Sequence, residues 1–184
     1  MINVEELLTE LAGLTRQHIH TVQSFKQLSL ETLNRKPAAG GWSILECVEH
    51  LNRYGDFYVP EIELRIQNSK RRPSTVFKPG LLGNYFAKSM LPKERLNKMK
   101  TFKSMDPADS ALDPSVLDKF IDQQEQLLQL LEASRQTDLT RVKTSISISK
   151  WIKLRLGDTL RVVIYHNLRH IVQAQKLVAN IPST

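Results

Sequence analysis

The chain has 184 residues, of which 41% are hydrophobic and 24% charged. This length suits one domain over residues 1–184, and the composition excludes a disordered or low-complexity protein. No apolar run approaches the roughly 18 residues of a membrane span, and the N-terminus shows no secretory signal. The single cysteine, Cys47, excludes an internal disulfide and a cysteine-based metal cage. We therefore expect a cytoplasmic protein with no transmembrane segment.

The formal net charge of +7 is concentrated in one segment. Ten basic residues and one acid, Glu94, lie between Lys70 and Lys103, so this segment carries +9 and the remaining chain −2. We treat residues from about 70 to 110 as a basic insert between two helices and expect it outside the helical core, near the mouth of a pocket. Such a segment would attract anionic ligands.

Four segments show the three- and four-residue apolar spacing of long amphipathic helices: residues 3–30, 43–67, 115–133 and 158–180. The second begins with Ser43-Ile-Leu-Glu46, a capping box, and Pro60 predicts a bend within it. A further short helix is expected over 81–90 inside the insert.

Between the third and fourth long helices, Ser and Ile alternate over residues 144–149. This alternation fits either a short strand or an extended connection. Because no partner strand is predicted, we favour the extended connection. Four long helices without paired strands predict an all-α protein, a four-helix bundle.

Two histidines in the fourth helix are spaced as metal ligands. His166 and His170 are four residues apart, so their rings lie about one turn apart at the edge of the apolar face. Both could reach one metal ion, although such a pair also occurs as a hydrogen-bonded or half-exposed polar pair. His50 lies at the edge of the apolar face of the second helix. Three histidines would leave a fourth metal position open for water or substrate, which is the catalytic pattern.

Other side chains are candidates for the pocket or for orienting a ligand. Glu46, one turn before His50, could orient the His50 ring, but we favour its capping role. Tyr54, one turn after His50, could contact substrate or pack in the core. Gln173 flanks the histidine pair. His18 lies in the middle of an apolar face and is a hydrogen-bonded core residue, a pocket residue, or a fourth ligand that would close the site.

Two motifs resemble the signatures of a known family. Residues 40–51, Gly-Gly-Trp-Ser-Ile-Leu-Glu-Cys-Val-Glu-His-Leu, resemble the W-S-x-x-E…H-L signature of the DinB-like superfamily. Residues 166–173, His-Asn-Leu-Arg-His-Ile-Val-Gln, resemble its second signature, H-x-x-x-H followed by an apolar residue and Gln. The order of the elements is also similar over nearly the whole chain. The basic insert matches no feature of the family.

The resemblance implies an up-down-down-up four-helix bundle with one long crossover. It also implies a divalent metal, zinc or nickel, held by His50, His166 and His170. Characterised relatives include S-transferases and isomerases that use a low-molecular-weight thiol, and others are described as metal-dependent hydrolases. The resemblance thus implies a metal-dependent S-transferase or hydrolase that acts on a small molecule.

Three classes of function remain as hypotheses. The first is the metal-dependent enzyme, with a low-molecular-weight thiol as its possible second cofactor. The second is a non-catalytic stress-response or ligand-binding module with a structural or vestigial metal. The third is nucleic-acid binding through the basic insert, which we do not expect because the insert contains no recognised binding motif. The oligomeric state stays open, and a homodimer is one alternative.

Overall fold

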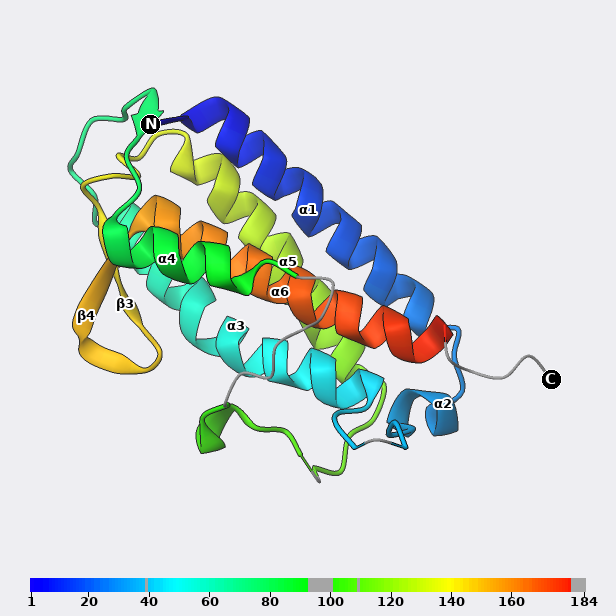
Figure 1. The fold of residues 1–184 in the computed structure, drawn as a ribbon. Coiled ribbons are helices and arrows are strands. Elements are labelled where there is room, and N and C mark those ends of the chain that lie inside the picture. The colour runs from blue at the N-terminus through cyan, green and yellow to red at the C-terminus, as the bar shows by residue number, and fades with distance from the viewer. Residues whose placement is uncertain (39, 93–100, 109, 180–184) are drawn as a thin grey trace.

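The structure, a computed structural model, describes residues 1–38, 40–92, 101–108 and 110–179. Its four long helices are α1 (Val4–Phe25), α3 (Ile44–Gln67), α5 (Ser115–Ser134) and α6 (Leu156–Ala179). They pack as a bundle in which α1 and α6 run in one direction and α3 and α5 in the other (Figure 1). The predicted all-α four-helix bundle is confirmed, and so is its up-down-down-up order.

The helix boundaries follow local capping signals. The expected first helix ends at Phe25, and a separate short helix, α2 (Leu30–Asn34), follows because Ser29 accepts a hydrogen bond from the Thr32 N–H at its start. The capping box at Ser43 is present, with the Ser43 side chain bonded to the Glu46 N–H and the Glu46 carboxylate to the Ser43 N–H. The helix that follows continues through Pro60.

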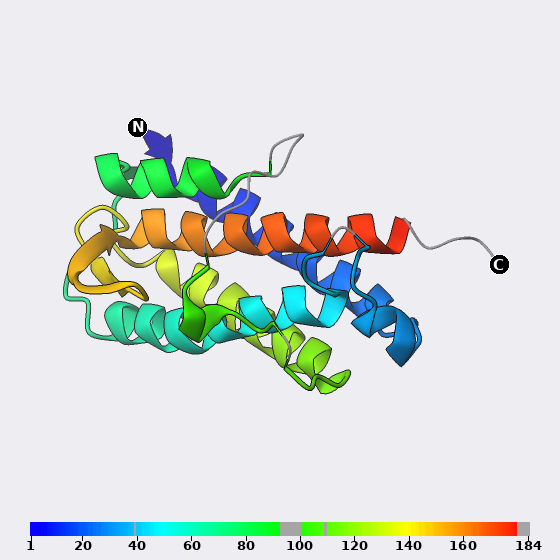
Figure 2. The ribbon, with the colours of Figure 1, turned by 60° about the horizontal axis from the view of Figure 1, so that its bottom comes forward.

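The helices α3 and α5 are parallel neighbours, so the chain must return along the bundle between them (Figures 1 and 2). This crossover contains α4 (Leu81–Met90), as the sequence predicts, and a short 3-10 helix, η1 (Lys103–Met105). Its strand β2 (Val76–Phe77) pairs antiparallel with β1 (Ile2–Asn3). Four of the ten basic residues of the insert, Lys93, Arg95, Lys98 and Lys100, lie outside the described residues.

A buried polar network attaches α4 to the first turn of α6. The Gly80 N–H donates to Asp158 Oδ2 at 2.7 Å, and Arg161 bridges Asp158 and Asn84 at 3.3 and 3.0 Å. The two helices also approach closely at Gly83, where an added Cβ would lie 2.5 Å from the Cβ of Asp158. Helix α4 is therefore packed against the bundle, whereas residues 70–73, before β2, are exposed.

The expectation of an unpaired extended connection near residue 146 is wrong. Strand β3 (Lys143–Ile146) pairs antiparallel with β4 (Ser149–Arg155) in a hairpin whose register is irregular between Ser145 and Ile146. The partner strand was missed because tertiary contacts hold the hairpin in place. Thr144 is hydrogen-bonded to Thr159 of α6 at 2.6 Å, and the Ser145 N–H donates to Glu61 of α3 at 2.6 Å.

The apolar core follows the length of the bundle as two adjoining clusters. One lies at the end where α4 and the hairpin pack and includes Leu8, Ile62 and Leu160, while the other includes Val48 and Phe120 at the opposite end. The bundle is thus held together by apolar packing along its axis, and the candidate site opens on one side of it.

Among the described residues, no helix combines the length and apolar character needed to cross a membrane.

Candidate metal centre

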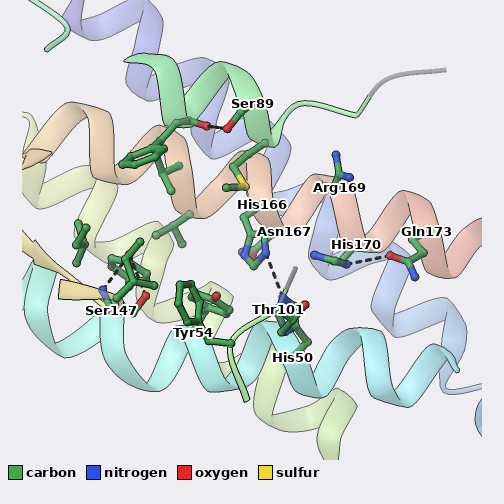
Figure 3. Close-up of a pocket in the computed structure, with 18 of the residues that line it drawn as sticks. His50, Tyr54, Ser89, Thr101, Ser147, His166, Asn167, Arg169, His170 and Gln173 are labelled. Atoms are coloured by element: carbon green, nitrogen blue, oxygen red, sulfur yellow. Dashed lines mark hydrogen bonds between the residues drawn. The ribbon is translucent and has the colours of Figure 1, made fainter. Parts of the chain in front are cut away.

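A cavity of about 930 Å³ lies between α3, α4, α6 and the β3–β4 hairpin (Figure 3). Gly40, Gly41 and Trp42, just before the Ser43 cap, line one part of it, and the hairpin lines another part. The glycines before the cap have φ angles of 76° at Gly40 and 126° at Gly41, a left-handed backbone that other residues rarely adopt. This turn brings Trp42 to the wall of the cavity.

Three histidine side chains converge in this cavity. His50 extends from α3, and His166 and His170 extend from successive turns of α6 (Figure 3). Nε2 of His50 lies 3.2 Å from Nε2 of His166, and one ring nitrogen of each of the three lies within 4.8 Å of the others. Within the described part of the chain, this is the group of potential metal ligands that the fold brings together.

The outer nitrogen of two of these rings is fixed by a hydrogen bond. Nδ1 of His50 donates to the carbonyl oxygen of Met105 at 2.7 Å. Nδ1 of His170 donates to Oε1 of Gln173 at 3.0 Å. Because both partners are acceptors, Nδ1 carries the proton in each ring and Nε2 keeps its lone pair. Such bonds commonly orient histidine ligands and select their tautomer in metalloproteins.

Aromatic side chains enclose the histidines from two sides. The Trp42 ring centroid lies 4.6 Å from that of His50 and 5.5 Å from that of His170. The Tyr54 ring lies 5.0 Å from His50 and 4.8 Å from His166, both in edge contacts. These contacts restrict the rotation of the rings.

The electrostatic environment keeps the three rings neutral. Burial lowers the pKa of His50 to about 4 and, together with the neighbouring His50, the pKa of His170 to about 3. Burial also holds the pKa of His166 well below its usual range, with a further contribution from the other two histidines. At neutral pH the cavity therefore presents uncharged imidazole nitrogens, which is the form that binds metal ions.

The donor set fits a divalent metal ion. Two ligand nitrogens at 2.0–2.1 Å from a tetrahedral ion are about 3.3 Å apart, close to the observed separation of His50 and His166. Imidazole nitrogens suit zinc and nickel. Three protein ligands would leave one position of a tetrahedral ion free for another ligand, as in catalytic zinc sites. The arrangement can therefore hold an ion and present it to a small molecule.

Comparison with known proteins identifies the family of the chain. Residues 13–174 match the sequence profile of the DinB superfamily, which covers most of the chain. The chain belongs to the DinB superfamily. No curated protein sequence matches it.

A solved structure shows the same fold as this DinB superfamily protein. YfiT from Bacillus subtilis, described as "a probable metal-dependent hydrolase with an unusual four-helix bundle topology", is 15% identical in sequence. The TM-score is 0.62, and the match covers 97% of this chain and 89% of YfiT. At this level of identity the likeness concerns the fold.

Of the other residues singled out from the sequence, two line the cavity of this DinB superfamily protein and two do not. Tyr54 contacts two histidine rings, and Gln173 bonds to His170. Glu46 is buried beneath the helix cap, where it binds the Ser43 N–H and Lys36. Glu46 thus has the capping role that the sequence favours, and Nδ1 of His50 is oriented by the Met105 carbonyl.

His18 is fully buried in α1, outside both the histidine group and the lining of the cavity. Neither of its ring nitrogens has a hydrogen-bond partner among the described residues. It is therefore not the hydrogen-bonded core residue that the sequence favours, and it does not close the site as a fourth ligand.

Three residues of the site escaped the sequence analysis. Met105 acts through its backbone carbonyl, for which no side-chain signal exists. Trp42 had a signal, because it stands in the first motif directly before the capped helix. Asp106 provides the carboxylate among the described lining residues, and it lies close enough to His50 to affect the pKa of that ring. Asp106 lies in the crossover, and the sequence does not predict that the crossover passes the cavity.

Proposed function

We propose that this protein is a metal-dependent enzyme that acts on a small molecule, and that His50, His166 and His170 hold one zinc or nickel ion. The observation that carries the proposal is the convergence of the three rings while Nδ1 of His50 and of His170 is held by an acceptor. A buried group of three neutral histidines costs stability without a bound ligand, since their polar atoms lose water. A metal ion would offset that cost.

The reaction is an S-transfer from a low-molecular-weight thiol or a hydrolysis. A bound divalent ion supplies a Lewis acid that lowers the pKa of a thiol or a water molecule in its open position. Burial raises the pKa of Tyr54, so its phenol keeps its proton and can donate a hydrogen bond to an oxygen of the substrate. Trp42 and Tyr54 pack against the histidine rings and would shield one side of the reacting groups from water.

Asp106 distinguishes the two reactions. Asp106 lines the cavity, and its charge acts on the pKa of His50, so its carboxylate could accept a proton from an attacking water. Hydrolysis that uses this base should fall by about 10²- to 10⁴-fold in the Asp106→Asn variant. Thiol transfer needs no such base, because the metal ion alone lowers the pKa of the thiol. Assaying the variant on ester and on thiol-plus-electrophile substrates separates the two.

The first experiment is elemental analysis of the purified protein and of histidine variants. We expect about one zinc or nickel per chain in the wild type and a large loss of metal in His50→Ala and His166→Ala. His20→Ala is the matched control because His20 is exposed on α1, away from the site. Equal metal contents in all four proteins would contradict the assignment. Retained metal with no turnover of any substrate would favour the non-catalytic module.

A further inference from the structure

The cavity extends well beyond the three histidines, and its second half has a different chemistry. We call this half the apolar lobe; it is lined by Tyr58, Phe86, Ile146, Leu154, Val162 and Val163. These side chains come from α3, α4, the hairpin and the first turns of α6. In Figure 3, Ser147 and Gln173 mark opposite ends of the cavity, with Tyr54 and His166 between them.

The polar atoms around the apolar lobe are already bonded to one another. The Ser147 N–H donates to the Tyr58 hydroxyl at 3.3 Å, and the Ser89 hydroxyl donates to the Phe86 carbonyl at 2.7 Å. The charged side chains among the described lining residues are Asp106 and Arg169, which adjoin Met105 and His170 in the chain at the other end. The lobe therefore offers a ligand apolar contact and no charge.

The geometry of the helices sets the extent of the lobe. Tyr58 follows His50 by eight residues on α3, a rise of about 12 Å along the helix. On α6, Val162 precedes His166 by one turn, about 6 Å. The lobe thus begins next to the histidines and continues for two turns of helix, an elongated space in line with the candidate metal.

Large apolar side chains also surround the mouth of the cavity. Tyr85, Ile148 and Phe102 line the cavity and are nevertheless 68%, 47% and 52% exposed. Clusters of exposed apolar side chains at a pocket are typical of binding surfaces for apolar partners. The apolar part of a ligand could contact these side chains before the ligand enters the cavity.

We propose that the substrate is an amphiphile whose alkyl or arylalkyl chain lies in the apolar lobe while its reactive head group lies at the three histidines. The position of the head group rests on the function proposed above. The binding of the chain rests on the shape and lining of the lobe alone. The two parts can therefore be tested separately.

Isothermal titration calorimetry with hexanol, octanol and decanol tests the lobe without any metal-binding head group. We expect the dissociation constant to fall by about two- to fourfold per added methylene until the lobe is filled. The same increments should appear in a series of n-alkyl hydroxamates, whose head groups bind metal ions.

Two variants tie the chain-length effect to the lobe. Val162→Phe fills the lobe and should abolish the gain from octanol to decanol, whereas Val178→Phe, on the same helix outside the cavity, should preserve it. Ile148→Asp is a second variant; Ile148 is already half-exposed, so it should fold while losing affinity for the longer chains. Circular dichroism checks the fold of each variant.

A flat alkanol series in the wild type, or equal effects of Val162→Phe and Val178→Phe, would overturn the proposal. Failure of the metal site gives a different pattern. Acetohydroxamate would then not bind and no metal would be found, while the alkanol increments would persist. If metal and acetohydroxamate bind but affinity does not depend on chain length, only the proposal for the apolar lobe is overturned.

Discussion

The backbone carbonyl of Met105 accepts a hydrogen bond from Nδ1 of His50 at 2.7 Å. This bond joins the crossover to a candidate metal ligand on α3. The crossover is held there by Arg53, one turn beyond His50, whose guanidinium donates to the Asp106 carbonyl at 2.7 Å and to Ser110 at 3.3 Å. The orientation of His50 therefore depends on a segment more than fifty residues away in the chain.

Substitution of Arg53 should weaken metal binding although Arg53 is not one of the three candidate metal-binding residues. In Arg53→Met the residues around Met105 lose their attachment to α3, and we expect metal affinity to fall by about tenfold, the lower end of the effect of outer partners of metal ligands. Arg65→Met is the control, because Arg65 makes a similar ion pair with the glutamate four residues earlier. Competition with a chromophoric chelator measures the metal affinity of both variants. Equal affinities of Arg53→Met and Arg65→Met would contradict the role of the crossover.

Gln173 should affect metal affinity through His170. Gln173→Leu removes the acceptor for Nδ1 and should lower metal affinity by about 10- to 100-fold. Gln173→Glu keeps an acceptor at that position and should restore most of the affinity. The same chelator competition measures these changes. Equal losses in the two variants would mean that packing, and not the hydrogen bond, is what Gln173 supplies.

His18 should make the protein less stable at acidic pH. Burial lowers its pKa from 6.5 to about 4, so the unfolded chain binds a proton more readily than the folded protein. Stability due to this difference is present above pH 6.5 and is lost as the pH falls toward 4. Between pH 7 and pH 5 we expect His18 to account for about 2 kcal/mol of lost unfolding free energy.

His18→Leu should remove that part of the pH dependence, as measured by urea unfolding at the two pH values. The other buried histidines remain in both proteins, so the difference between wild type and variant isolates His18. An unchanged pH dependence would show that His18 is protonated equally in both states.

Close approach at Gly83 should make α4 sensitive to a single methyl group. In Gly83→Ala the new Cβ would lie 2.5 Å from the Asp158 Cβ, which should shift α4 and cost about 1–3 kcal/mol. Gly13→Ala, within α1, meets no atom within 4 Å and should instead stabilise the protein by up to about 1 kcal/mol. Thermal unfolding compares the two, and a stabilised Gly83→Ala would contradict the packing of α4 on α6.

The sequence predicted those features that have local signals. Apolar spacing located the four long helices, and the Pro and Gly residues of the insert delimited the helix over 81–90. Helix geometry and the two motifs located the three histidines, and the second motif contains Gln173. The hairpin, the carbonyl of Met105 and the apolar lobe depend on contacts between segments far apart in the chain. Apart from the Ser–Ile alternation over residues 144–149, such contacts leave no periodicity or motif in the sequence, so the structure was needed to find them.

Cobalt substitution tests the central claim most directly, namely that the three histidines hold one metal ion with an open position toward the cavity. The visible spectrum of the cobalt-loaded protein should gain a sulfur-to-metal charge-transfer band when 2-mercaptoethanol is added, and its intensity should indicate four or five ligands. His50→Ala should lose this response. A cobalt spectrum that does not change with millimolar thiol, or one that His50→Ala leaves intact, would contradict the account.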